Sequence, residues 1–449
     1  MGMAVWALIS FIVIILIWAI FTKRNIGEAM ILGFITTLLF AGDRAFELLF
    51  PSLMRGLTHE VVFASLAFIF MAQLINHTGL IGRIIQILNS LIGRLPGGAA
   101  YVNTFGSGLF ALVAGSGSGI AATTGSITIP WMERSGWRKE HAASIVAGNS
   151  GFGSIIPPNS TMFIMLGFAP VAASVGQSSL FIALYVAGLY ALVHRVLVVF
   201  IMTKRYNIQP VHPDLIQPIG TSFRAGWTSL LIFLGIIVPL LINFGPLANW
   251  FISLEGVGQS AMDAISFIVW VPVFMILFTL VVGRNHLPKG KKEWGRFFEK
   301  TAPSYFVIGP VLIFTFATSA VLNEIGLTEQ LQALMTSFAV PKWLMIAIVG
   351  IVITLVATPL ATSATIATIG LASFGALTAV GVDPLLAVVT IMMFGATEGS
   401  TPTSGPIYVA TGMAKIGAEK TYIPLLIYYT IPLLIISWLI GMGILPIPL

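Results

Sequence analysis

Two sets of glycine, serine, threonine and proline residues interrupt otherwise apolar stretches of this chain. The first set covers residues 115–126 and 149–161. The second covers residues 358–363 and 395–406, and it includes the carboxylate of Glu398. Backbone that lacks helix hydrogen bonds offers carbonyl oxygens to a small hard cation, and the N-terminal ends of half-helices attract an anion. These residues could therefore hold a cation together with an anionic solute.

The two sets are copies of one another. Residues 118–161 align without a gap on residues 363–406, at an offset of 245 residues (363 − 118), and this places Pro157 on Pro402. Proline cannot donate a backbone hydrogen bond and clashes with the preceding turn, so each copy should break a helix at this point. Two interrupted membrane segments in corresponding positions indicate the substrate site of a secondary transporter.

The composition requires a membrane around these segments. Of the 449 residues, 57% are hydrophobic and 8% are charged, and the mean hydropathy is +0.98. A span needs about 20 apolar residues, so the chain has room for roughly ten crossings. The absence of cysteine excludes disulfides and sulfur-ligated metals, and the six histidines lack close ligand spacing, so we expect no transition-metal site. The net charge of +6 does not require a nucleic-acid partner, because basic loops in a membrane protein usually mark its inner side.

Hydropathy and helix breakers divide the chain into elements. Spanning helices are expected near residues 4–21, 26–41, 60–76, 180–203, 225–243, 264–282, 303–322 and 421–442. Amphipathic pieces are expected at 80–95 and 326–339, re-entrant hairpins at 98–132 and 342–380, and broken helices at 139–170 and 384–415. Lys23 and Arg24 follow the first apolar run instead of preceding it, which predicts a retained helix rather than a signal peptide.

The basic residues support the hairpins. If both hairpins enter and leave on one side, only Arg44, Arg55 and Lys342 of the 22 lysines and arginines fall outside, and the other 19 fall inside. Five crossings then separate the hairpins, so the second copy is inverted relative to the first. The predicted fold is an all-α polytopic membrane protein with an inverted repeat, two re-entrant hairpins and two broken helices, with both termini on the outer face.

We divide the chain accordingly. Residues 1–76 form N-terminal scaffold helices, and residues 77–176 form the first repeat with its amphipathic arm, hairpin and broken helix. Residues 177–322 form further scaffold helices, 323–415 the second repeat and 416–449 a C-terminal helix.

Residues 115–126, Ile129, Pro130 and residues 155–158 occur in an order and spacing that resembles a known family. This family is the large membrane subunit of tripartite ATP-independent periplasmic (TRAP) transporters. The resemblance implies an elevator-type importer of the bacterial inner membrane and no enzymatic activity. It implies sodium as the coupling ion, with protons as an alternative, and no cofactor. The implied partners are a periplasmic solute-binding protein, a small organic acid and a small four-helix membrane subunit, which a chain of this length is not expected to contain as a fusion.

The resemblance also implies where the ligands bind, at the hairpin tips and the helix breaks. The predicted cation ligands are Gly115, Ser116, Ser118, Gly119, Ser150, Gly153, Pro157, Thr358, Ser363, Glu398, Ser400 and Thr401. The predicted substrate ligands are Thr123, Asn149, Ser154, Asn159, Ser160, Thr365, Thr403 and Ser404.

The second copy departs from the family pattern. Many members carry an acidic residue near the second tip, where this chain has Ala361 and Thr362, and many have a second proline where it has Thr403. Glu398 lies outside the pattern, and an acid at membrane depth is either a cation ligand or proton carrier, or a structural acid bonded to neighbouring N–H or hydroxyl groups.

Other interpretations of the same residues remain open. Glycine and serine also allow close helix packing. A one-component transporter would need no binding protein, and a passive channel would need no coupling ion. An intramembrane hydrolase would need an activated serine, and no such motif is present.

Overall fold

The structure is a computed structural model that describes every residue except 1, 23–25, 115, 244–245, 255–257, 259–266, 328, 331–332, 334–339, 359, 403 and 449. Its described part contains helices and no strands. By length and composition, seven helical stretches of this part could each cross a membrane, and six shorter apolar helices accompany them. The predicted all-helical membrane fold is therefore confirmed.

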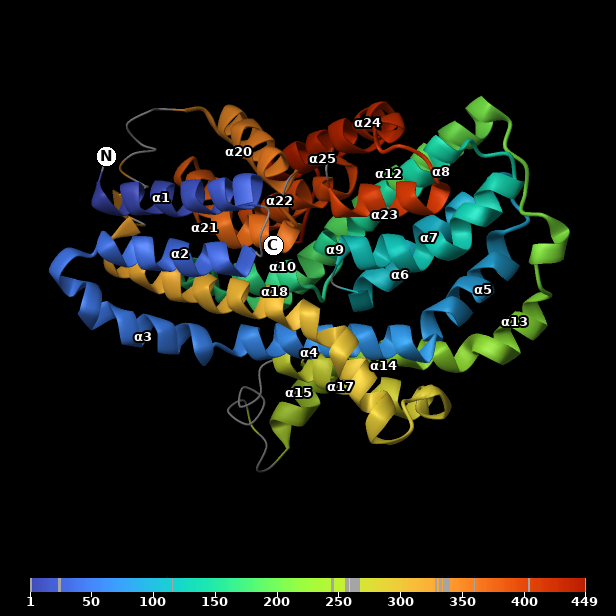
Figure 1. The fold of residues 1–449 in the computed structure, drawn as a ribbon, viewed down its shortest axis with the longest axis horizontal. Helices are drawn as coiled ribbons and strands as arrows, with labels where there is room; N and C mark the ends of the chain where they lie inside the picture. Colours follow the sequence, from blue (N-terminus) through green and yellow to red (C-terminus); the bar gives the residue numbers. More distant parts are fainter. Residues whose placement is uncertain are drawn as a thin grey trace.

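One group of helices pairs α18 with α2, α3 and α4, and α17 with α4 and α14, and within it α3, α4 and α14 run along the lower side of Figure 1. In this group and its connections lie α1 (Met3–Ile17), α2 (Ile26–Leu39), α3 (Ala45–Leu57), α4 (Glu60–Thr78), α5 (Leu80–Ile92), α13 (Ile219–Gly226), α14 (Leu234–Asn243), α15 (Pro246–Ser253), α17 (Phe267–Val282) and α18 (Gly290–Glu324). Gly79 ends α4 in a left-handed conformation with φ of 66°, so the chain can turn directly into the amphipathic arm α5.

The other group contains both repeats. The first repeat has α6 (Gly98–Ala114), α7 (Gly117–Arg134), α8 (Lys139–Ser150), α9 (Phe152–Ile155), α10 (Ser160–Gly167) and α11 (Ala169–Ser174). The second has α20 (Lys342–Ala357), α21 (Thr362–Ala379), α22 (Pro384–Gly395), a 3-10 turn at Ala396–Ser400 and α23 (Gly405–Ala414). Around them lie α12 (Gln177–Tyr206), α24 (Glu419–Leu425) and α25 (Ile431–Gly441).

The hairpins and the breaks lie where the sequence predicts them. Figure 1 shows α6 and α7 toward one end of the long axis and α20 and α21 toward the other. The inverted halves also interlock, because α23 of the second repeat packs against α7 and α8 of the first, and α10 packs against α21.

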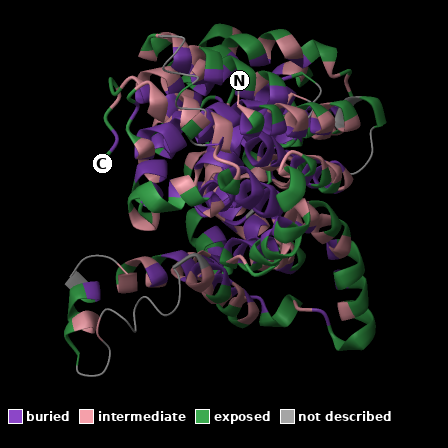
Figure 2. Ribbon diagram, turned by 90° about the vertical axis from the view of Figure 1, so that its left-hand side faces the viewer, coloured by how far each residue is buried: buried purple, intermediate pink, exposed green. Residues whose placement is uncertain are grey.

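Burial follows this arrangement. Figure 2 shows buried residues gathered in the middle of the molecule and exposed ones on its outside. The second broken helix is deeply buried: of its most apolar stretch of 18 residues, within residues 384–414, 94% is buried. Large apolar side chains such as Phe46, Phe50 and Leu355 are instead exposed on the outside, as expected where lipid is the solvent.

The structure differs from the prediction in two places, and a third place stays untested. The amphipathic helix α3 was not predicted, because Glu47, Pro51 and Arg55 interrupt its apolar run and its 13 residues are too few to span. The basic residues between the spans expected at 264–282 and 303–322 lie largely in the first part of α18, which starts at Gly290 and not near residue 303. The expected amphipathic piece at 326–339 falls mostly outside the described residues.

Candidate functional site

A central cavity of about 470 Å³ lies where the two hairpin tips meet the two helix breaks. The tips contribute residues 116–119 and 361–363, and the breaks contribute residues 153–154, 159–161 and Glu398. Helices α4 and α18 form the opposite wall. Segments that are about 245 residues apart in the sequence therefore converge on one cavity, whose lining combines polar groups of the tips and breaks with apolar side chains of α4 and α18.

Nine of the predicted ligands line this cavity. They are Ser116, Ser118, Gly119, Gly153, Ser363 and Glu398 from the predicted cation set, and Ser154, Asn159 and Ser160 from the predicted substrate set. Ser116 caps α7, since its hydroxyl accepts a hydrogen bond from the Gly119 N–H at 3.4 Å. Asn159 caps α10 in the same way, accepting from the Met162 N–H at 2.8 Å. The two helix starts are thus fixed at the cavity wall.

The other predicted ligands lie outside the cavity lining. Ser150, Pro157, Thr358, Ser400, Thr401, Thr123, Asn149, Thr365 and Ser404 are not among the residues that line it. Several hydroxyls instead bond their own helix, as Thr365 bonds the Ala361 carbonyl at 3.2 Å. Gly115 and Thr403 lie outside the described residues.

Glu398 is the buried acid of this site. Its side chain is 8% exposed, and it accepts a hydrogen bond of 2.9 Å from the backbone N–H of Thr362, the first residue of α21. The Thr362 hydroxyl donates a second hydrogen bond to the same carboxylate oxygen. The carboxylate therefore sits on the positive N-terminal end of the second hairpin's inner helix, where a negative charge is stabilised.

The corresponding contact in the first repeat has no carboxylate. Glu398 aligns with Gly153 and Thr362 with Gly117. A methyl group added at Gly153 would lie 3.4 Å from the Gly117 nitrogen, so tip and break meet at the same place in both copies. Repeat one has only the Ser116 cap at the start of α7, whereas repeat two places the carboxyl group of its own Glu398 at the start of α21.

The two repeats also touch one another across the site. The Ser154 hydroxyl of the first break donates to the Thr362 hydroxyl of the second tip at 3.3 Å. In return, a methyl group at Gly117 of the first tip would lie 3.2 Å from Pro406, just after the second break. A shift of either hairpin must therefore disturb both halves of the cavity.

Asn149 belongs to a buried polar network inside the first hairpin rather than to the cavity. Its side-chain amide donates to Asn103 Oδ1 at 2.9 Å and to Thr104 Oγ1 at 3.0 Å. Asn103 in turn donates to Thr124 at 3.2 Å and to Thr128 at 2.9 Å. All five side chains are fully buried, and the network ties α6, α7 and α8 together.

Replacing the centre of this network should destabilise the protein. We expect Asn103→Leu to lower the free energy of unfolding by about 2–4 kcal/mol, because buried donors and acceptors on three partners lose their bonds. Thermal unfolding in detergent measures the change. The control is Ser107→Ala, which removes only one bond of 3.2 Å to Thr124 and should cost about 1 kcal/mol. Equal unfolding temperatures for the two variants would show that the network adds no stability.

The sequence did not single out the polar residues on the opposite wall. Ser65, Gln73 and Asn76 of α4 and Ser304 of α18 line the cavity. Polar side chains inside an apolar span were the available signal, since such groups tend to face a cavity or another helix. Asn76 also contacts the first hairpin, because the Thr123 hydroxyl donates to its Oδ1 at 3.4 Å.

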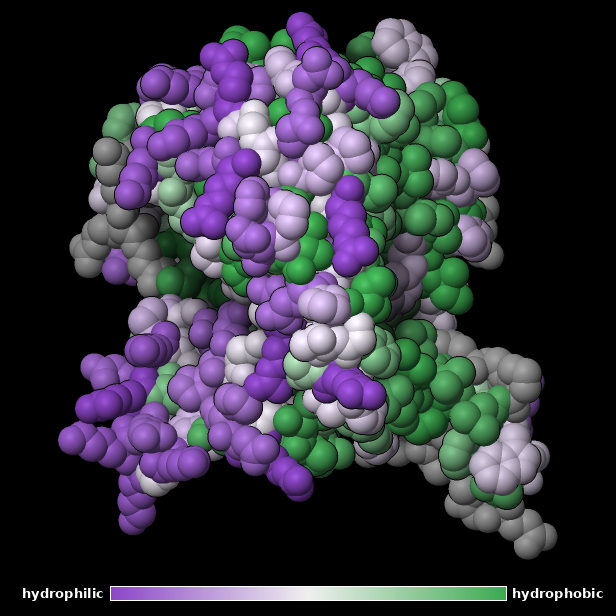
Figure 3. Space-filling model, turned by 90° about the vertical axis from the view of Figure 1, so that its right-hand side faces the viewer, coloured by the Kyte–Doolittle hydropathy of each residue, from purple (hydrophilic) through white to green (hydrophobic). Residues whose placement is uncertain are grey.

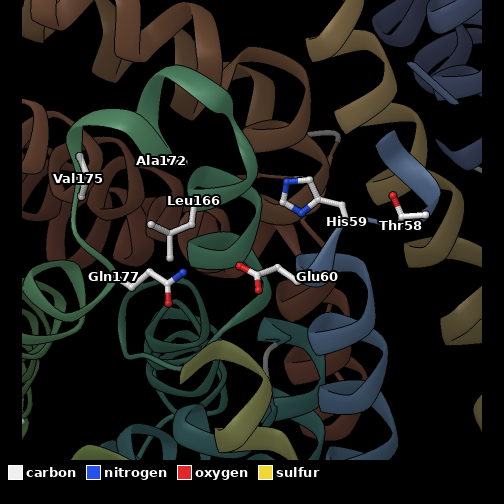
Figure 4. Close-up of a pocket in the computed structure, with 7 residues that line it drawn as sticks. All are labelled: Thr58, His59, Glu60, Leu166, Ala172, Val175 and Gln177. Atoms are coloured by element: carbon white, nitrogen blue, oxygen red, sulfur yellow. The ribbon is translucent and has the colours of Figure 1, made fainter. Parts of the chain in front are cut away.

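A second pocket of about 440 Å³ lies away from the predicted ligands. Figure 4 shows Glu60 at the start of α4 and Gln177 at the start of α12 pointing toward one another, with Leu166 and His59 beside them. None of the predicted ligands lines this pocket, whereas nine line the central cavity. The central cavity is therefore the candidate site.

The end of the molecule where α7 ends and α8 begins is rich in polar side chains. Figure 3 looks onto this end, where hydrophilic side chains spread widely over the surface. Arg134, Arg138 and Lys139 are exposed there. These three are among the 19 basic residues that the sequence predicts on the inner side.

Comparison with known proteins assigns the family. Residues 8–442 match the family model described as "Tripartite ATP-independent periplasmic transporter, DctM component". The chain belongs to this family. It is thus the large permease subunit of a secondary transporter that depends on a substrate-binding protein, and it is not an enzyme. Family membership also implies a small membrane subunit.

The similarity to known relatives extends over between about half and nine-tenths of the chain. The C4-dicarboxylate TRAP transporter large permease protein DctM of Pseudomonas aeruginosa is 24% identical, over 91% of this chain and 90% of the relative. The sialic acid TRAP transporter large permease protein SiaM of Vibrio cholerae is 22% identical over 55% of each chain. The solved YdaH transporter of Alcanivorax borkumensis has a similar fold, with a TM-score of 0.68 over 90% of each chain at 16% identity.

Proposed function

We propose that this chain is the permease of a sodium-coupled importer that takes a small organic acid from a periplasmic binding protein. The observation that carries the proposal is the single cavity lined by both hairpin tips, both helix breaks and the Glu398 carboxylate. A carboxylate inside the cavity is a hard oxygen ligand for a cation, and carbonyl oxygens at the helix breaks would complete the coordination of a sodium ion.

The second repeat would bind the cation, and the first repeat would bind the solute. Glu398 already occupies the start of α21, which makes the second repeat the site for a cation. The start of α7 carries no internal anion and opens into the cavity beside Ser116 and Ser118. The partial positive charge at this helix start, where the Ser116 hydroxyl is the internal cap, suits the carboxylate of the solute. The relatives that transport C4-dicarboxylates and sialic acid carry acidic solutes, which agrees with this chemistry.

The motion we propose is of the elevator type. The repeats would move as one body against α4 and α18, which form the opposite cavity wall, and the small subunit would hold that wall in the inner membrane. The contacts of α23 with α7 and α8 join the two repeats, which favours their joint movement.

Both termini would face the periplasm. The Ala4 N–H donates to the Gln330 side chain at 2.9 Å, and the Trp438 indole donates to the Trp343 carbonyl at 2.8 Å. Trp343 follows Lys342, one of the three basic residues expected outside. These bonds support placing the start and the end of the chain on the same side.

Uptake by proteoliposomes tests the proposal. We expect an inward sodium gradient to raise uptake of a labelled carboxylate at least about tenfold over a potassium control, because the gradient supplies the free energy of accumulation. The chain would be reconstituted with its small subunit and loaded binding protein. Uptake that follows a proton gradient and ignores sodium would contradict sodium coupling. Equal uptake without the binding protein would favour a one-component transporter.

A further inference from the structure

Arg195 is a buried charge that the proposed transport cycle does not use. It lies in the middle of the apolar helix α12, and only 1% of it is exposed. A charged side chain at this depth is costly unless other groups stabilise it. Arg195 does not line the central cavity, so it is not a ligand of the solute there.

Its partners are carbonyl groups and a ring rather than a carboxylate. The guanidinium donates to the Gly148 carbonyl from Nε at 3.3 Å and from Nη2 at 3.1 Å. A third bond, of 3.4 Å, goes to the Ala191 carbonyl, and the Phe152 ring lies 4.1 Å from the guanidinium carbon. Within the described part of the chain, no carboxylate forms an ion pair with Arg195. Among the described residues, the groups that stabilise this charge directly are therefore the two carbonyls and the Phe152 ring.

The guanidinium stands where two half-helices end. The first broken helix stops α8 at Ser150, and the second stops α22 at Gly395. Each C-terminal end carries partial negative charge and carbonyl oxygens without helix partners. Gly151 touches both ends: a methyl group added there would overlap the Ala396 carbonyl oxygen and lie 2.9 Å from Arg195 Nη2. Two negative helix ends and one arginine thus meet at a single junction.

We propose that Arg195 is a resident cation that takes the place of one coupling ion at the junction of the two breaks. Carbonyl oxygens at a helix break are the ligands that a sodium ion would use, and here the guanidinium already binds one of them. Because arginine keeps its proton inside proteins, this charge is permanent and travels with the protein through the cycle. The inference rests on the proposed sodium coupling, and it implies that the transporter binds fewer sodium ions than its helix breaks could hold.

Two substitutions separate charge from packing. Arg195→Gln removes the charge and keeps an amide that can donate to the Gly148 carbonyl, whereas Arg195→Lys keeps a positive charge. In Arg195→Gln, the vacated carbonyl oxygens should bind sodium. We expect its half-saturating sodium concentration to fall at least about tenfold, because a nearby unit charge no longer repels the ion, and its Hill coefficient for sodium to rise. Arg195→Lys should keep the wild-type values.

The sodium dependence is measured in two ways. Uptake by the reconstituted complex gives the half-saturating concentration and the Hill coefficient. Thermal unfolding of each variant in sodium chloride and in choline chloride reports sodium binding even where uptake is slow. Arg195→Gln should gain more stability from sodium than the wild type does.

Three other results would contradict either the role of Arg195 or the proposed sodium coupling. If Arg195→Gln shows the wild-type sodium dependence in both measurements, Arg195 does not replace an ion. If it cannot be purified folded even in high sodium chloride, the inference is also wrong, because sodium should fill the vacated position. A wild-type protein whose uptake ignores sodium removes the proposed coupling, and the inference with it.

Discussion

Glu398→Gln is expected to reduce sodium-driven uptake by about 10- to 100-fold, the cost of losing an interaction between a buried charge and its partner. Glutamine has nearly the same shape, and its carbonyl oxygen can still accept both hydrogen bonds from Thr362. The second hairpin should therefore stay in place while the charge that attracts the cation is lost. Uptake at several sodium concentrations measures the effect, and the half-saturating concentration should rise.

The matched control is Thr362→Val, which removes the hydroxyl donor but leaves the carboxylate and the backbone N–H bond of 2.9 Å. If Glu398 is a cation ligand, this control should keep most of the sodium dependence and lose mainly stability. If Glu398 only caps α21, Thr362→Val should be the more damaging change, and Glu398→Gln should transport normally. The second pattern would remove Glu398 from the coupling argument.

Gly151→Ala should disrupt the junction of the breaks and abolish transport. The added methyl group would overlap the backbone carbonyl oxygen of Ala396, which cannot rotate away as a flexible side chain could. Forcing the two breaks apart should lower the free energy of unfolding by about 1–3 kcal/mol or more. It should also move Arg195 and the wall of the cavity. Thermal unfolding and uptake measure the two effects.

Gly412→Ala is the control for this change. Gly412 lies in α23, and a methyl group there would meet no atom within 4 Å. Alanine favours a helix over glycine by about 1 kcal/mol, so this variant should be as stable as the wild type or more so. If Gly151→Ala unfolds at the same temperature as Gly412→Ala, the close approach of the breaks does not limit stability.

Most of the elements around the site could be predicted from local chemistry. The hairpin predicted at 98–132 is α6 and α7, and the one predicted at 342–380 is α20 and α21. These boundaries depend on glycine and proline, whose effects on the backbone are felt within a few residues. The helix α3 could not be found in this way, because an amphipathic helix with Pro51 resembles a loop when only hydropathy is counted.

The ligand set was harder to predict than the elements. Ser154 and Asn149 lie five residues apart in one break, yet Ser154 lines the cavity and Asn149 is bonded inside the first hairpin. A polar residue type at a helix break does not say which way its side chain points. That direction depends on the neighbouring helices.

The sequence alone determined that this is a membrane protein with two broken, inverted repeats, because hydropathy and helix breaking are properties of neighbouring residues. The tertiary structure alone decided which groups meet. Glu398 lies 36 residues from Thr362, and Arg195 lies 47 from Gly148. Neither pairing has a local signature, since it depends on how hairpins and half-helices pack. The placement of these two buried charges, one at a helix start and one where two helices end, emerges only from that packing.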